Sequence, residues 1–318
     1  MGVRTPVCEL FGIEVPIFLA GMGGVAMAEV CAAVSEAGGF GVLGAAGLAP
    51  EDLRSEMRAV RERTDRPFGV DLLAALPDEV RAAVPIIETE GAAALITGLG
   101  VAEPMIGRCH DAGLKVMAIG GKVSHALAAQ AAGCDAVVAQ GTEAGGHTGL
   151  VAGMAVIPQT VDAVDIPVLA AGSIVDGRGF AAALCLGAQG IWVGTRFIAS
   201  HEARAASLFK GRIVDADSAD TTITRCYSGK PMRVIRNAYV EDWGRRPDEL
   251  MPFPDQLVHS VREGLLGFSD DDEVKPERTA MPAGQGVGGI DDILPVAEIV
   301  KNFITEARQT LDSVNAWF

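Results

Sequence analysis

One short stretch of the chain combines a histidine with closely spaced glycines. The stretch Gln140-Gly-Thr-Glu-Ala-Gly-Gly-His147-Thr-Gly149 directly follows an apolar run, and His147 is the only one of the five histidines in such a loop. An imidazole, with an ordinary pKa of about 6.5, can act as a base, an acid or a hydrogen-bond donor to an anion. A purely structural histidine is the alternative, but the glycine flanks leave this side chain room to face a ligand. We therefore expect His147 to be catalytic.

Glycine-rich loops also follow three other apolar runs, at Gly21-Met22-Gly23-Gly24, Gly172-Ser173 and Gly194-Thr195. Glycine lets the backbone approach a flat or anionic ligand closely. In barrels of parallel strands, the loops after the last two strands commonly bind phosphate through N–H groups and hydroxyls. The pattern predicts a phosphorylated cofactor at these loops, and tight turns without a ligand are the alternative.

Several other kinds of site are not supported by the sequence. The segment Gly21–Ala26 fits the dinucleotide pattern G-x-G-x-x-A, but the next run, Phe40–Gly47, carries no acidic residue to hold a ribose. HxxH, HExxH and G-x-S-x-G spacings are absent, which disfavours zinc and serine hydrolases. The six cysteines form no CxxC pair and are expected to be reduced thiols. We expect no metal site.

The elements that must position these loops repeat along the chain. Eight short apolar runs begin 20 to 32 residues apart with helix-like stretches between them, as parallel strands joined by crossover helices do. The runs are continuously apolar because both faces of each strand are covered. An α/β fold of the closed (β/α)8 (TIM) barrel type is predicted, and a doubly wound open sheet is its competitor. The expected strands are Pro16–Ala20, Phe40–Gly44, Phe68–Leu72, Ala93–Thr97, Lys115–Ile119, Asp135–Ala139, Pro167–Ala171 and Gly190–Gly194.

The repeating pattern stops after the eighth strand. Residues 206–282 are mixed, polar and proline-rich, and helical periodicity returns over Ile290–Val314. We expect 1–205 and 283–318 to form the barrel and 206–282 to form an inserted cap that contributes to the substrate site.

Composition excludes other classes of protein. Hydrophobic residues make up 49% of the 318 residues, and 26 basic against 41 acidic residues give a net charge of −15, which would repel nucleic acid. No apolar stretch reaches the roughly 18 to 20 residues of a membrane span. The N-terminus resembles neither a secretory signal nor a myristoylation site. We expect a cytoplasmic protein that binds neither nucleic acid nor a membrane, with a homodimer as the candidate assembly.

Five segments together resemble a known family, the FMN-dependent class I nitronate monooxygenases, formerly called 2-nitropropane dioxygenases, whose relatives include the flavin-type enoyl-ACP reductases. The segments are Gln140–Gly149, Ala171–Gly179, Val193–Phe197, Arg233–Asn237 and Ala283–Gly286. The likeness runs over nearly the whole chain in matching order. It is specific for the flavin barrel and less specific for the substrate.

The resemblance implies an FMN cofactor and assigns roles to residues. Asp71 stands where relatives usually carry Asn, and a carboxylate can only accept hydrogen bonds. A lysine near the end of the fifth strand often faces the flavin, and Lys122 is the candidate here, where a cation would stabilise the anionic reduced flavin. Catalysis is assigned to His147, the phosphate to Gly172, Ser173, Gly194 and Thr195, the ring to Gly21, Met22 and Gly23, and further cofactor contacts to Gln140, Gly145 and Gly146.

The resemblance implies oxidation of an alkyl nitronate, or of a nitroalkane, by O2 to a carbonyl compound and nitrite. His147 would donate a hydrogen bond to the nitronate or remove the α-proton of a neutral nitroalkane. One alternative keeps FMN and passes hydride from NAD(P)H to a quinone or an enoyl thioester. A second alternative is a barrel that binds a phosphorylated ligand without turnover.

Overall fold

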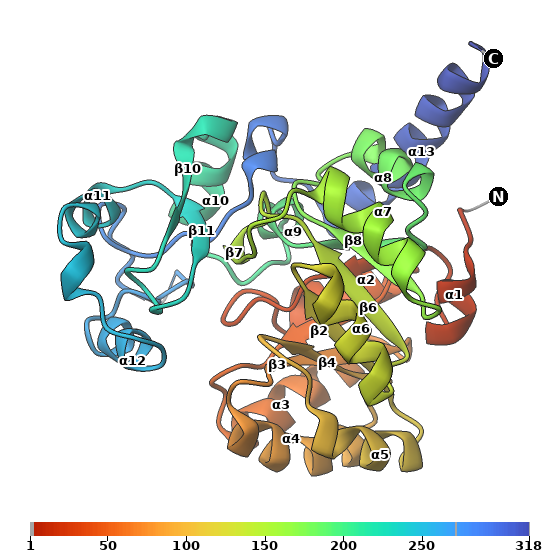
Figure 1. Ribbon diagram of the computed structural model, residues 1–318, viewed down its shortest axis with the longest axis horizontal. Coiled ribbons are helices and arrows are strands. Elements are labelled where there is room, and N and C mark those ends of the chain that lie inside the picture. Colours follow the sequence, from red (N-terminus) through yellow and green to blue (C-terminus); the bar gives the residue numbers. More distant parts are fainter. Residues whose placement is uncertain (1–2, 271, 318) are drawn as a thin grey trace.

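The computed structural model describes residues 3–270 and 272–317 and contains a barrel of eight parallel strands with helices around it (Figure 1). Residues 1–2, 271 and 318, which fall in the segments expected for barrel and cap, lie outside this description. The strands follow one another in the order β1-β9-β8-β6-β5-β4-β3-β2, and a parallel bridge between Phe18 and Phe40 joins the two ends of that order. The predicted (β/α)8 barrel is confirmed. Its strands are β1 (Ile17–Leu19), β2 (Gly41–Gly44), β3 (Phe68–Leu73), β4 (Ala94–Gly98), β5 (Lys115–Gly120), β6 (Ala136–Gln140), β8 (Val168–Ala171) and β9 (Gly190–Val193).

The barrel interior is filled from one end. Phe11, on helix α1 (Pro6–Phe11), packs edge-on against Phe18 and Phe40 with ring centroids 5.2 and 5.1 Å away. These rings belong to one buried cluster with Leu169 of β8 and Trp192 of β9. Because α1 covers this end with apolar side chains, the carboxyl ends of the strands are left as the place for a ligand.

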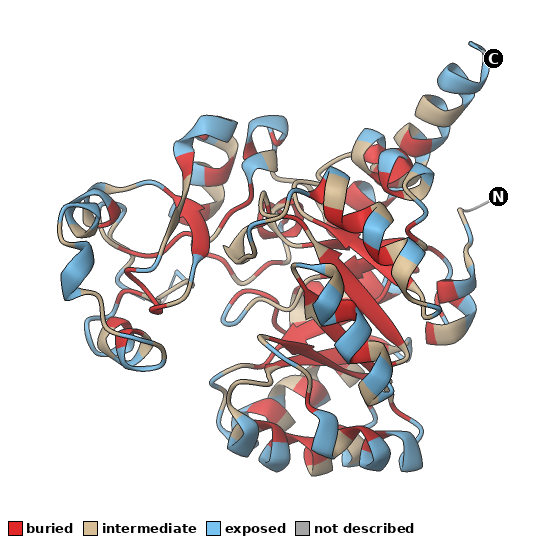
Figure 2. Cartoon of the chain, viewed as in Figure 1, coloured by how far each residue is buried: buried red, intermediate tan, exposed pale blue. Residues whose placement is uncertain are grey.

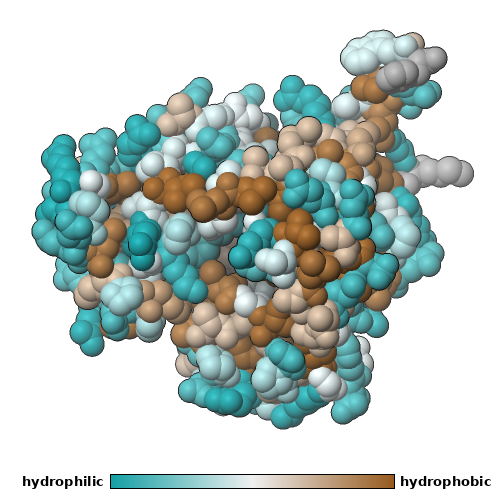
Figure 3. Space-filling model, in the orientation of Figure 1, coloured by the Kyte–Doolittle hydropathy of each residue, from teal (hydrophilic) through white to brown (hydrophobic). Residues whose placement is uncertain are grey.

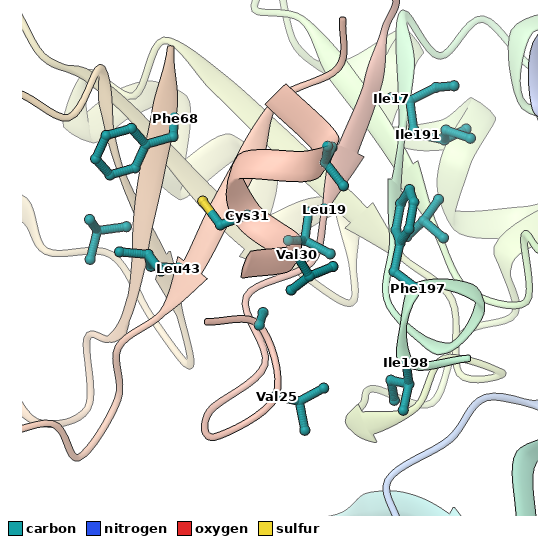
Figure 4. Packing of buried hydrophobic residues seen from close by; sticks show 14 of the residues in the cluster. Ile17, Leu19, Val25, Val30, Cys31, Leu43, Phe68, Ile191, Phe197 and Ile198 are labelled. Carbon is teal, nitrogen blue, oxygen red and sulfur yellow. The ribbon is translucent and has the colours of Figure 1, made fainter. Parts of the chain in front are cut away.

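Helices cover the outer face of the strands with apolar side chains. In Figure 4, Val30 and Cys31 of α2 lie between Leu19 of β1 and Leu43 of β2, and in Figure 2 the buried residues gather on the strands and on the inner faces of the helices. The predicted last helix is present as α13, which packs on α8 and α2. The surrounding helices are α2 (Ala28–Glu36), α3 (Pro50–Arg61), α4 (Pro77–Thr89), α5 (Glu103–Asp111), α6 (Val123–Ala132), α7 (Gly153–Ala163), α8 (Gly177–Cys185) and α13 (Val296–Asn315), with the short α9 (Thr195–Ile198) after β9.

An insertion with its own small core lies between the eighth barrel strand and α13, at the left of Figure 1. Its three-stranded antiparallel sheet takes one strand, β7 (Gly146–His147), from the loop after β6. In that sheet Met232 is paired with His147 and Arg233 with Gly146. The insertion thus holds the histidine loop directly. Its other elements are α10 (Ser207–Asp215), η1 (Ser218–Asp220), β10 (Thr221–Thr224), β11 (Met232–Ile235), α11 (Ala238–Gly244), η2 (Pro247–Glu249) and α12 (Asp255–Arg262), followed by η3 (Gln285–Gly289).

Candidate active site

A cavity of about 970 Å³ lies at the carboxyl ends of the barrel strands and is walled on its other side by the insertion. This volume is at the upper end of the range for small-molecule sites, about 300 to 1,000 Å³. Figure 3 shows apolar residues in a band across this face of the molecule, from the insertion on the left to the barrel on the right. Of the residues expected at the site, those that line the cavity are Gly21, Met22, Gly23, Asp71, Gln140, Gly145, Gly146, His147, Gly172, Ser173, Gly194 and Thr195.

Contacts from both the barrel and the insertion hold His147. The amide Nε2 of Gln140 donates to the His147 carbonyl oxygen at 2.6 Å, and the imidazole Nε2 lies 2.9 Å from Ser228 Oγ. Burial, and secondarily the nearby Lys230 ammonium, lower the pKa of His147 to about 4. The imidazole is therefore neutral at pH 7 and has a lone pair that can accept a proton.

The loops after β8 and β9 present unused backbone donors. Gly172 (φ 115°) and Ser173 (φ 53°) both have left-handed backbone conformations, the latter rare for a residue with a side chain. Within the described part of the chain, the N–H groups of Gly172, Ser173 and Gly194 donate to no acceptor. The Thr195 hydroxyl accepts from the N–H of Gly284 at 3.0 Å and keeps its own proton to donate. All four residues line the same cavity, where such donors could serve an anion.

Asp71 is buried beneath the glycine loop that follows β1. A Cβ atom on Gly21 would overlap the Asp71 carboxyl group, so only glycine fits there. The Oδ1 atom of Asp71 is buried and has no hydrogen-bond partner among the described residues. Desolvation raises the pKa of this carboxyl well above its usual range, because burial disfavours the charged form. A backbone hydrogen bond from Leu72 acts in the opposite direction but has the smaller effect.

Asp71 is consequently a neutral carboxylic acid at pH values where an exposed aspartate is charged, and it can donate a hydrogen bond. The sequence alone treats it as a carboxylate that only accepts. The difference arises from burial, which residue type does not reveal.

Lys122 is not brought together with the other expected residues. It is exposed at the start of α6, outside the residues that line the cavity. His125, three residues later, does line the cavity, and burial together with the charge of Lys122 lowers its pKa. The strand β5 ends at Gly120, and Lys122 is the N-cap residue of α6, two positions beyond the end of the strand.

The insertion contributes site residues that sequence reasoning did not assign. Ser228, Tyr227 and Lys230 line the cavity from the turn between β10 and β11. Arg233 is buried and its guanidinium donates to the Thr142 carbonyl oxygen at 3.1 and 3.2 Å, which ties β11 to the histidine loop. Arg233 opens Arg233–Asn237, one of the five segments that carry the family resemblance, and that resemblance is the sequence signal for this contact.

The insertion and its neighbouring turns give the cavity an apolar wall. Its side chains include Phe209, Met232, Leu257, Leu266 and Phe268. Among the described residues, no three His, Cys, Asp or Glu side chains are grouped so that they could hold a metal ion. No described helix has both the length and the apolar character of a membrane span.

Comparison with known proteins agrees with this arrangement. The family model for nitronate monooxygenase matches residues 4–306. The chain belongs to the nitronate monooxygenase family. A probable nitronate monooxygenase of Staphylococcus saprophyticus is 32% identical over 83% of this chain and 88% of its own length.

Other relatives in and around the family carry different names. An octahydro-1H-indene-4-carboxyl-CoA dehydrogenase of Mycobacterium tuberculosis is 40% identical over 76% of this chain and 68% of its own length. The structure of FabK from Thermotoga maritima superposes with a TM-score of 0.92 at 35% identity, covering 99% of this chain and 100% of that one. Family membership makes the chain an oxidoreductase that acts on small molecules, and it sets aside the alternative of a barrel without turnover.

Proposed function

We propose that the protein uses FMN to oxidise alkyl nitronates, or the parent nitroalkanes, with O2 to carbonyl compounds and nitrite. The observation that carries the proposal is the neutral, partly buried imidazole of His147 in the wall of an apolar cavity. Glycine loops with free N–H groups line the same cavity. An imidazole that is neutral at pH 7 has a lone pair with which it can accept a C–H proton.

The residues present fit FMN. Gly172, Ser173, Gly194 and Thr195 offer N–H and hydroxyl donors to the phosphate, and the glycine loop at Gly21–Gly23 offers a floor without side chains at its two glycines. The unpartnered Oδ1 of Asp71 is a polar atom that a cofactor in the cavity would satisfy. FMN, when bound, supplies the centre that accepts electrons from the substrate.

The chain's own groups prepare the substrate. His147 takes the α-proton of a neutral nitroalkane, and the electron pair of the C–H bond becomes the negative charge of the nitronate. Lys230 lines the same cavity and supplies a positive charge near that anion. The apolar wall excludes water and strengthens these electrostatic interactions. We further propose that residues 206–282 act as the cap that selects the substrate.

A second candidate is a flavin reductase or dehydrogenase that uses a nicotinamide or a thioester. The volume of the cavity and its apolar wall favour this reading, because a small nitronate would leave much of the space beside a flavin unfilled. A relative named as a carboxyl-CoA dehydrogenase, at 40% identity, also supports it.

Product analysis separates the two candidates. Purified enzyme is incubated in air with ethyl or propyl nitronate without nicotinamide, and nitrite and aldehyde are measured. We expect both to form in equal amounts. Nicotinamide oxidation with a quinone or enoyl thioester under nitrogen, without nitrite from any nitronate, would instead establish the second candidate.

A further inference from the structure

The imidazole of His147 has one side-chain partner among the described residues, and it comes from the insertion. Ser228 Oγ lies 2.9 Å from His147 Nε2, and Ser228 is 1% exposed. Water therefore has almost no access to this hydroxyl, and its hydrogen bonds must be made to protein groups.

The hydroxyl of Ser228 has a complete set of partners only in one arrangement. It carries one proton and two lone pairs. It donates to the Lys230 carbonyl oxygen at 3.2 Å and accepts from the Lys230 N–H at 3.3 Å. A carbonyl can only accept and a backbone N–H can only donate, so a single lone pair is left for the imidazole. All three contacts are hydrogen bonds at the same time only when Nε2 of His147 carries a proton, because the other tautomer would take the hydroxyl proton away from the Lys230 carbonyl oxygen.

The turn that carries Ser228 is itself fixed. Arg225 Nε donates to the Gly229 carbonyl oxygen at 2.8 Å, and the Gly229 N–H donates to the Arg225 carbonyl oxygen at 2.8 Å. On the other side of the contact, His147 is paired with Met232 in the shared sheet. Serine and histidine are therefore both attached to the same three-stranded sheet, which sets the distance between them.

We propose that Ser228 is a positioning residue that holds the His147 imidazole as the Nε2–H tautomer and leaves Nδ1 bare to take the substrate proton. This inference rests on the proposed function. In the transfer, the C–H bond of the nitroalkane breaks, its proton forms a bond with Nδ1, and its electron pair stays on the nitronate. Ser228 acts through the imidazole, to which its hydroxyl is hydrogen-bonded, and takes no part in the bonds that break and form.

Nitrogen NMR tests the tautomer directly and needs no substrate. The holoenzyme is labelled with ¹⁵N-histidine, and the His147 signals are assigned with H147Q. Wild type and S228T, which keeps the hydroxyl, should show a protonated Nε2 and a bare Nδ1 at pH 7. In S228A the ¹⁵N chemical shifts of Nδ1 and Nε2 should become more alike, because the two tautomers exchange. A proton on Nδ1 in wild type, or an unchanged pattern in S228A, would overturn the inference.

A kinetic comparison tests the consequence for the reaction. A neutral nitroalkane needs a proton removed, whereas its nitronate does not. S228A should lower kcat/KM for the nitroalkane by about 10-fold or more relative to the nitronate, a part of the 10² to 10⁴ that acid–base catalysis supplies. S228T should restore the wild-type ratio. Equal losses on both substrates would contradict a positioning role.

Two further variants serve as controls for the role of Ser228. Ser260 is also a buried serine of the insertion, and its Oγ has no partner among the described residues, so S260A should change neither the tautomer nor the substrate ratio. If S228A does not fold, S228C keeps the side-chain volume with a weaker acceptor and should show the same loss. Absence of turnover on both nitro substrates would refute the proposed function, while the NMR result would still decide the role of Ser228.

Discussion

Replacement of Asp71 by asparagine should change how stability depends on pH. Burial raises the pKa of Asp71 well above its usual range, so the folded protein keeps a proton that the unfolded chain releases above about pH 4. The folded state then binds more protons than the unfolded state, and the free energy of unfolding falls as pH rises. The stabilisation is complete below the unfolded pKa and is lost as pH rises through the folded pKa.

The size of the effect follows from one proton. A single proton difference changes the free energy of unfolding by about 1.4 kcal/mol per pH unit, or about 2.7 kcal/mol over two units. Asparagine has nearly the same shape and does not titrate, so D71N lacks this slope. We expect the stability of D71N relative to wild type to increase as pH rises between the unfolded and the folded pKa of Asp71, with a limiting slope of about 1.4 kcal/mol per pH unit.

Urea unfolding at a series of pH values measures this difference. The slope m should match in both proteins, so that midpoints report stability alone. D65N, which changes an exposed aspartate in the turn after α3, serves as the matched control and should give a curve parallel to wild type. Parallel curves for D71N and wild type would show that Asp71 is not a neutral buried acid, and the reasoning from burial would fail.

Three other changes are expected to have specific effects. H147A should keep the yellow colour of bound flavin but reduce turnover of a neutral nitroalkane by about 10² or more, measured by nitrite release; full activity would remove His147 from the mechanism. Turnover of a nitroalkane by wild type should rise through about pH 4, where His147 loses its proton, and then level off, and a midpoint near the ordinary histidine pKa would contradict the effect of burial. G172A should lower the free energy of unfolding by about 1 to 3 kcal/mol, because φ is 115° at this position, and it should also weaken flavin retention. G107A changes an exposed helical position with open space at its Cβ and should retain flavin normally. Equal flavin retention in both variants would exclude the proposed phosphate site.

The barrel could be predicted because its signals are local. Each strand is a continuous apolar run buried on both faces, so Phe68–Leu72 is recognisable without knowing what it contacts, and β3 extends it by one residue to Leu73. The same holds for the glycine loops. The loops at Gly21 and Gly172 meet at one cavity because parallel strands place their carboxyl ends at one edge.

Features that depend on distant contacts could not be predicted. His147 pairs with Met232, 85 residues away, and no periodicity in either segment indicates that partner. Ser228 is one serine among several in an irregular region until the fold places its hydroxyl beside the imidazole. The protonation of Asp71 depends on desolvation by burial in the folded protein. Lys122 is the N-cap residue of α6 and lies outside the residues that line the cavity.

Reduction of the protein by a nitronate in the absence of oxygen tests the central claim most directly. The purified protein is expected to be yellow with stoichiometric FMN, and its visible absorbance should bleach on addition of ethyl or propyl nitronate without any nicotinamide. Readmission of air should restore the colour, with nitrite and aldehyde as products. A protein that bleaches only with NADH or NADPH, or one that neither contains nor takes up FMN, would contradict the account.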